Sequence, residues 1–206
     1  MKRMILASGS PRRKELLQML EVPFEVLVSD TKEVITKNEP AEVTKELSYQ
    51  KAMAVAEQVE EGIIIGADTV VSIDGKILGK PADTEEAREM IYKLQGKSHM
   101  VYTGVTVIAK SGDMVSASSF AEGTKVNVAP MTENEIEAYI STDEPYDKAG
   151  AYGIQGLFGK FIEGIKGDYF NVVGLPVHRL YEELKKFDTS YNILNSVKDK
   201  EIEDLL

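Results

Sequence analysis

Short apolar runs and helically spaced apolar positions divide the chain into strands and helices. Predicted strands cover residues 4–7, 24–28, 62–65, 70–73, 76–78, 99–109 and 114–128. Predicted helices cover residues 11–20, 40–60, 83–95, 132–140 and 176–187. Asp74-Gly75 and Ser111-Gly112-Asp113 supply turns between neighbouring strands. The order of these elements predicts a mixed α/β sheet that is covered by helices and extended on one side by an antiparallel ribbon.

One charged residue interrupts the apolar stripe of the predicted helix 40–60. The stripe consists of Val43, Leu47, Ala54 and Val55, and Lys51 falls inside it, one turn after Leu47. A lysine in such a stripe either extends its ammonium group to water or faces a buried anion. The pattern leaves both explanations open.

The first strand runs into a helix start that carries two arginines. Ser10 has the residue type and place of an N-cap, and Pro11 suits the first helical position. Arg12 and Arg13 follow in the first turn, where the helix dipole disfavours cations. Together with free N–H groups and the hydroxyl of Ser8, they indicate a phosphate site. The alternative is a solvated basic helix start.

Composition excludes several classes of protein. The 206 residues carry a net charge of −10, which disfavours binding to nucleic acid. The absence of cysteine excludes disulfides, thiolate metal sites and cysteine nucleophiles. Because no apolar stretch has the length of a signal peptide or a membrane span, we expect a cytoplasmic protein with no membrane partner. His99 and His178 lie far apart in the sequence, and we expect structural roles for them.

Further groups suited to phosphate chemistry follow the predicted strands. Asp68 and Thr69 come directly after residues 62–65, and Lys80 lies in a Gly-Lys-Pro loop. A carboxylate at the end of a buried strand can bind a divalent ion or orient a water, and the alternative is a turn-forming aspartate. Gln155 in a glycine loop offers an amide for a base edge, but taken alone the pattern favours a plain turn. Neither a Walker A motif nor a dinucleotide-binding glycine motif is present.

Six stretches resemble, in order, the Maf (septum-formation inhibitor) family of nucleoside triphosphate pyrophosphatases. They are ASGSPRR with ELL (7–17), GADTVV (66–71), LGKP (78–81), HMVYTGV (99–105), DEPYDKAGAYGIQG (143–156) and GDYFNVVGLP (167–176). The resemblance covers residues 2 to about 187. It divides the chain into a Maf-like domain at 1–187 and a C-terminal tail at 188–206, for which we expect partial helicity.

The resemblance implies a curved, inosine-triphosphatase-like sheet and a metal-dependent hydrolysis of nucleoside triphosphate to nucleoside monophosphate and pyrophosphate. Carried over by position, Asp68, Lys51 and Lys80 would be catalytic, with Asp68 accepting the proton of the attacking water. The substrate-binding residues would be Ser8, Ser10, Arg12, Arg13, Thr69 and Gln155. Glu33, which lies in the loosest of the matching stretches, would bind Mg²⁺ or Mn²⁺ together with Asp68.

The family contains branches that differ in substrate. Arg12, Thr69 and Gln155 together resemble the dTTP/UTP branch, so dTTP, UTP and modified pyrimidine triphosphates are the expected substrates, with a homodimer as a further expectation. The alternative is a nucleotide-binding regulator of septum formation with little catalysis. An intact Asp68 favours the enzyme, because a sensor needs phosphate ligands but no carboxylate that activates water.

Overall fold

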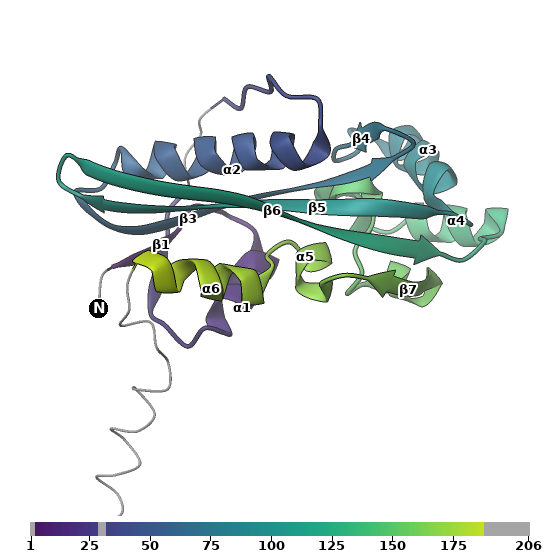
Figure 1. The fold of residues 1–206 in the computed structure, drawn as a ribbon. Helices are drawn as coiled ribbons and strands as arrows, with labels where there is room; N and C mark the ends of the chain where they lie inside the picture. Colours follow the sequence, from purple (N-terminus) through teal and green to yellow (C-terminus); the bar gives the residue numbers. More distant parts are fainter. Residues whose placement is uncertain (1–2, 29–31, 188–206) are drawn as a thin grey trace, which may run out of the picture.

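The computed structural model describes residues 3–28 and 32–187, so the expected tail at 188–206 lies outside the described residues. A seven-stranded mixed sheet forms the centre, in the order β2-β1-β3-β5-β6-β7 with β4 beside β3 (Figure 1). The strands are β1 (Met4–Leu6), β2 (Phe24–Val26), β3 (Glu61–Ile73), β4 (Lys76–Leu78), β5 (Ser98–Ser111), β6 (Met114–Val128) and β7 (Ile162–Lys166). Only β1 pairs in parallel, with β2 and β3, and all other pairs are antiparallel. The predicted mixed α/β sheet with an antiparallel extension is confirmed.

Helices cover both faces of this sheet. They are α1 (Pro11–Gln18), α2 (Pro40–Ala56), α3 (Thr84–Leu94), α4 (Glu133–Ile140), α5 (Tyr169–Val173) and α6 (Val177–Phe187). Helix α2 lies alone on one face of the long strands, and α1, α5 and α6 lie on the other face (Figure 1). Each face buries its own apolar cluster, around Ala52, Val55 and Ile64 under α2 and around Leu17, Ile65 and Leu180 on the opposite side.

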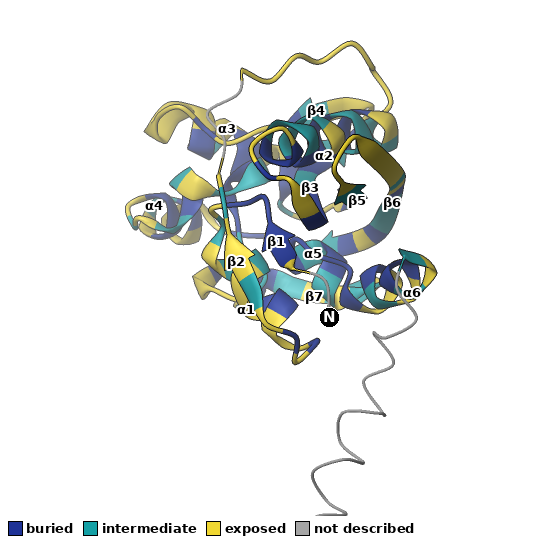
Figure 2. Cartoon of the chain, turned by 90° about the vertical axis from the view of Figure 1, so that its left-hand side faces the viewer, coloured by how far each residue is buried: buried dark blue, intermediate teal, exposed yellow. Residues whose placement is uncertain are grey.

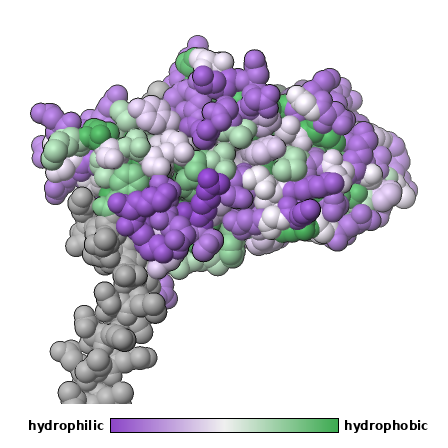
Figure 3. Space-filling model, viewed as in Figure 1, coloured by the Kyte–Doolittle hydropathy of each residue, from purple (hydrophilic) through white to green (hydrophobic). Residues whose placement is uncertain are grey.

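The surface is polar around these cores. Burial is concentrated in the strands and on the inner sides of the helices (Figure 2). The face seen in Figure 3 is mostly hydrophilic, with apolar residues scattered over it. None of the helices in residues 3–28 and 32–187 combines the length and the apolar character that a membrane crossing requires.

Three sequence predictions were wrong in detail. Helix α2 ends at Ala56 rather than near residue 60, and Ala52, not Ala54, is its fully buried alanine. Strand β7, which pairs with β6, lies in residues 146–174, where the sequence pattern predicts no element. Residues 62–73 form one continuous strand, so Asp68 lies in the middle of β3 and not at a strand end.

One edge of β3 is unpaired around Asp68. On that edge, β1 pairs with Ile63–Ile65 and β4 pairs with Val71–Ile73. In the part of the chain that the structure describes, no strand pairs with the intervening residues 66–70 on this edge. The sheet is therefore interrupted beside Asp68, whose side chain lines a cleft at this edge although its backbone belongs to a regular strand. We had expected a strand end to make the carboxylate available to a metal ion or a water, and this gap in the pairing of β3 has the same effect.

Two glycines bring α2 close to the sheet beside this edge. A Cβ atom added to Gly66 would lie 2.3 Å from the carbonyl oxygen of Ser48, and one added to Gly104 would lie 2.2 Å from the carbonyl carbon of Thr44. The helix backbone thus rests directly on the β3–β5 pair. Because side chains alternate along a strand, Asp68 is on the same face as Gly66 and meets the next turn of α2, where Lys51 lies.

Candidate active site

A cleft opens at the unpaired edge of β3. It consists of two adjoining hollows of about 820 and 390 Å³. The residues that line both are Ser10, Arg12, Arg13, Glu33, Lys51, Lys80 and Asp147. The smaller hollow continues along Ser8 and Gly9 toward α1, and the larger one continues over apolar side chains that include Leu47, Val71 and Ile77. The cleft therefore has a polar end and a less polar end.

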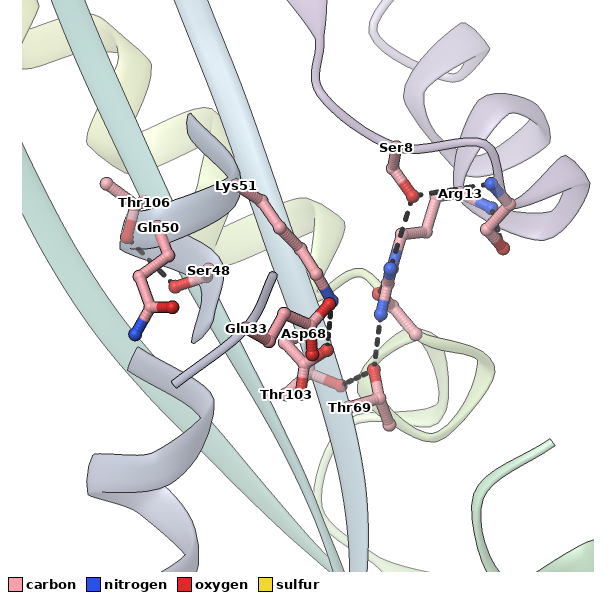
Figure 4. Close-up of polar contacts among 12 residues, drawn as sticks. Ser8, Arg13, Glu33, Ser48, Gln50, Lys51, Asp68, Thr69, Thr103 and Thr106 are labelled. Carbon is pink, nitrogen blue, oxygen red and sulfur yellow. Dashed lines mark hydrogen bonds and ion pairs between the residues drawn. The ribbon is translucent and has the colours of Figure 1, made fainter. Parts of the chain in front are cut away.

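The arginine cluster, defined as Ser8, Arg13, Thr69, Thr103 and the carbonyl of Gly174, forms one wall. The guanidinium of Arg13 donates to Ser8 Oγ at 3.2 Å and to Thr69 Oγ1 at 3.0 Å (Figure 4). It also donates to the Gly174 carbonyl at 2.9 Å. Thr69 in turn shares a hydrogen bond of 2.9 Å with Thr103. Burial lowers the pKa of Arg13, and the nearby Asp68 carboxylate opposes this shift. All three direct acceptors are neutral, so the cluster keeps its positive charge for a ligand.

The lysine cluster, defined as Glu33, Lys51 and Asp68, forms the opposite wall. The ammonium of Lys51 contacts Asp68 Oδ1 and lies 3.1 Å from Glu33 Oε1 (Figure 4). The Asp68 side chain is only 13% exposed, whereas that of Glu33 is 46% exposed. Of the two explanations for Lys51, the structure confirms the one in which it faces an anion.

Helix α1 begins at the smaller hollow with the cap that the sequence predicts. Ser10 caps the helix by accepting the N–H of Arg13 at 3.5 Å, and Pro11 occupies the first turn. Ser8 Oγ accepts the N–H of Ser10 at 3.3 Å. The helix N-terminus and the Ser8 hydroxyl therefore point toward the smaller hollow, an arrangement that suits an anion.

Arg12 pairs with the last residue of a short 3-10 helix, Glu144–Asp147, for which the sequence predicts no role. Its Nη1 lies 3.0 Å from Asp147 Oδ2, and Asp147 also accepts from Lys148 at 2.5 Å. Partial burial raises the pKa of Asp147, but the hydrogen bonds from Lys148 and Arg12 outweigh it and leave that pKa below its ordinary value. An anionic ligand in the cleft would compete with Asp147 for Arg12.

The less polar end of the cleft has a buried polar pair beneath it. Tyr152 lines the larger hollow, and its hydroxyl lies 2.6 Å from His99 Nε2. Burial lowers the pKa of His99 to about 4, so its imidazole is neutral. His178 is exposed on α6. Neither histidine faces the two clusters, which agrees with the structural roles expected for them.

The structure brings every predicted site residue to this one cleft. Lys80 lines both hollows, and Gln155 lines the larger one from an exposed turn. Sequence reasoning missed Asp147 as the partner of Arg12, and Thr103 as the support of Thr69. Both contacts join residues distant in sequence, so no local spacing could reveal them.

The carboxylates of the lysine cluster are suited to a divalent ion. Within residues 3–28 and 32–187, no three acidic or histidine side chains lie close enough to form a complete metal cage. Mg²⁺ commonly takes one or two carboxylates and completes its shell with water and substrate phosphates. Glu33 and Asp68, which approach the same ammonium group, fit that incomplete set.

The chain is similar to several known proteins. The family model described as Maf-like protein matches residues 3–187. A "dTTP/UTP pyrophosphatase" of Bacillus cytotoxicus is 54% identical over 92% of this chain and 97% of its own length. One of the same name from Bacillus cereus is 50% identical over 91% of this chain and 97% of its own length. Among solved structures, the Ham1 protein of Staphylococcus aureus aligns with 62% of this chain and 72% of its own, at 16% identity and a TM-score of 0.45.

Proposed function

Because the chain belongs to the Maf-like protein family, we propose that it hydrolyses nucleoside triphosphates to nucleoside monophosphates and pyrophosphate. The proposed substrates are dTTP and UTP, together with modified pyrimidine triphosphates of similar shape. The names of the two Bacillus relatives support both the reaction and the choice of base.

The convergence of two unlike charged clusters on one cleft is the observation that carries this proposal. Six cationic side chains line the cleft around the carboxylates of Glu33, Asp68 and Asp147; they are Arg12, Arg13, Lys37, Lys51, Lys80 and Lys148. Hydrolysis of a triphosphate consists largely of positioning and neutralising a polyanion, and such a set of cations suits that task. A local excess of positive charge on a protein of net charge −10 is consistent with an anionic substrate.

The substrate would lie along the cleft with its phosphates over the start of α1. Ser8, Ser10, Arg12 and Arg13 would hold the β- and γ-phosphates, since they line the smaller hollow. A guanidinium has five N–H groups, and Arg13 donates three to protein acceptors, which leaves two for phosphate oxygens. Lys51 and Lys80 would approach the α-phosphate from the other side of the cleft.

Asp68 would act as the general base. Its carboxylate takes a proton from a water molecule while the water oxygen forms a bond to the α-phosphorus. The bond between that phosphorus and the oxygen bridging to the β-phosphate breaks, and the electron pair leaves with pyrophosphate. Lys51 contacts Asp68 and keeps the carboxylate oriented toward the cleft. The cations then stabilise the charge that accumulates on the leaving group.

The proposed metal is Mg²⁺ or Mn²⁺, held by Glu33 and Asp68. When bound, such an ion neutralises phosphate charge and withdraws electron density from phosphorus. Lys51, which now bridges both carboxylates, would shift toward the substrate. A homodimer, a cytoplasmic location and an influence on cell division remain predictions.

Gln155 and the apolar wall would receive the nucleoside. The Gln155 amide offers both donors and an acceptor to a pyrimidine edge. A site whose buried polar groups are left unpaired by the wrong base rejects that base. We therefore expect dTTP and UTP to be preferred over ATP and GTP.

The test is pyrophosphate release from a panel of nucleoside triphosphates, with Mg²⁺ or Mn²⁺ supplied. We expect release from dTTP and UTP, and a fall in kcat of about 10²–10⁴-fold in Asp68→Asn, because an amide cannot accept the proton. Asp113→Asn, on the exposed β5–β6 turn, is the matched control and should behave as wild type.

Two outcomes would contradict the proposal. Release of orthophosphate in place of pyrophosphate would show that another bond is cleaved. Nucleotide binding by the wild type without any hydrolysis would favour the regulator. Full activity in Asp68→Asn would remove Asp68 from the mechanism while leaving the reaction intact.

A further inference from the structure

An extended segment, residues 32–39, leads into helix α2. Its side chains alternate between facing the cleft and facing away from it, and the proposed mechanism assigns no role to this pattern. From residue 33 to residue 37, Glu33, Ile35 and Lys37 line the larger hollow, whereas Val34 and Thr36 do not line either one; the alternation ends at Asn38, which also lines the larger hollow. Alternation of this kind places odd and even residues on opposite sides of an extended segment. Figure 2 shows the segment as an exposed arch that leads into α2.

Two side chains of α2 hold the even-numbered residues. The Gln50 amide accepts the N–H of Val34 at 2.9 Å and donates to its carbonyl at 2.6 Å. Glu46, one turn earlier, accepts the N–H of Thr36 at 2.8 Å and also bonds its hydroxyl. The segment is therefore anchored to the helix through residues 34 and 36, and this anchoring turns Ile35 toward the cleft.

Ile35 is an apolar side chain without apolar cover. It is 59% exposed, and it lines the hollow that contains Leu47, Val71 and Gln155. It does not line the smaller hollow, where Ser8 and the start of α1 lie. Ile35 thus lies at the end of the cleft that would receive the nucleoside under the proposed function, and away from the end that would receive the triphosphate.

We infer that Ile35 is a substrate-contacting residue that packs against the sugar or base of the bound nucleotide, and that Glu46 is a positioning residue which acts through it. This inference rests on the proposed function. Binding would remove the exposed apolar surface of Ile35 from water, and that gain would be absent for a ligand that consists of phosphate alone. Val34 is similarly exposed, at 55%, but lies outside the cleft.

The experiment compares Ile35→Ala with Val34→Ala, using dTTP and UTP as substrates and inorganic tripolyphosphate as an inhibitor. Ile35→Ala should raise KM for both nucleotides about tenfold and leave kcat nearly unchanged. The reason is that the substitution removes apolar carbon atoms that would pack against the bound nucleoside. Its inhibition constant for tripolyphosphate should equal that of the wild type. Val34→Ala should leave all three constants unchanged.

Glu46→Ala tests the anchoring, with Glu42→Ala as the control one turn earlier on α2. Glu42 pairs with Lys45 and not with the segment. Glu46→Ala should raise KM for nucleotides but not the inhibition constant for tripolyphosphate. Combined with Ile35→Ala it should add little, because both changes remove the same contact.

Each result decides between the two proposals. This inference would be overturned if Ile35→Ala had the same KM values as Val34→Ala. It would also be overturned if Ile35→Ala raised the inhibition constant of tripolyphosphate as much as the KM of dTTP. Neither result would contradict the proposed hydrolysis. A fully additive double variant would overturn the positioning role of Glu46. A wild type that releases no pyrophosphate from any nucleotide would overturn the proposed function, and this inference with it.

Discussion

The arginine cluster and the lysine cluster, which face each other across the cleft, differ in the partners of their cations. In the arginine cluster, the acceptors that the described residues offer to the Arg13 cation are neutral oxygens, namely two hydroxyls and a backbone carbonyl. In the lysine cluster, the cation of Lys51 is matched by the carboxylates of Glu33 and Asp68. The first arrangement is a fixed scaffold with an unneutralised charge, and the second is an ion-pair set that a substrate or metal can rearrange.

This difference follows from the faces of β3. Thr69 points to the side of α1 and α5, where the chain supplies hydroxyls and the Gly174 carbonyl. Asp68 points to the side of α2, where Lys51 reaches it. Neighbouring residues of one strand thus take part in opposite walls of the same cleft. We expect changes in the arginine cluster to lower both stability and activity, and changes in the lysine cluster to lower mainly activity.

The largest expected effect separates the clusters directly. Arg13→Ala removes three hydrogen bonds and leaves a cavity, so the free energy of unfolding should fall by about 2–4 kcal/mol. Lys51→Ala breaks contacts that are partly open to solvent and should cost about 1 kcal/mol or less. Urea unfolding measures both, and pyrophosphate release should be strongly reduced in each. If Arg13→Ala and Lys51→Ala lowered the free energy of unfolding equally, the two clusters would not differ in their contribution to stability.

A second effect lies outside both clusters, beneath the floor of the cleft. Burial holds the pKa of His99 at about 4 in the folded protein, against an ordinary value of 6.5. Between pH 6.5 and 4 the unfolded chain binds a proton that the folded chain does not, so stability falls as the pH is lowered through this window. The loss should reach up to about 3 kcal/mol at pH 4.

Unfolding by urea at a series of pH values measures this loss. His99→Gln, which retains a polar partner for Tyr152 but does not titrate, should flatten the pH dependence between pH 6.5 and 4. A variant with the same slope as the wild type would assign the acid sensitivity to groups other than His99.

The smallest of the three effects concerns the close packing of α2 against β3 at Gly66, which places Lys51 beside Asp68. Gly66→Ala places a methyl group 2.3 Å from the Ser48 carbonyl oxygen, so α2 must move away. We expect a loss of about 1–3 kcal/mol in stability. Turnover should also fall, because Lys51 moves with the helix. Gly164→Ala, in β7 with no atom within 4 Å of the added carbon, is the matched control. Turnover that survives in Gly66→Ala would show that the lysine cluster tolerates displacement.

Much of the fold could be predicted from the sequence because local patterns specify it. The Ser10 cap, the Asp74-Gly75 turn and the alternation of residues 99–109 each rest on interactions between near neighbours. The prediction was wrong where long-range pairing decides. Residues 66–69 look like a strand exit, but pairing with β5 carries the strand through them. Strand β7 exists because β6 offers it a partner, and its own residues show no clear period.

The sequence by itself determined the residue types of the site, their order along the chain and the membership in a family that they indicate. Only the tertiary structure decided which charges meet: Arg12 with Asp147, 135 positions apart, and Arg13 with Thr69, 56 positions apart. It also decided that Asp68 and Thr69 face opposite walls, and that Ile35 faces the cleft while Val34 does not. The physical reason is that residue chemistry is a local property, whereas the partner of a charge depends on how sheet, helix and loop pack together.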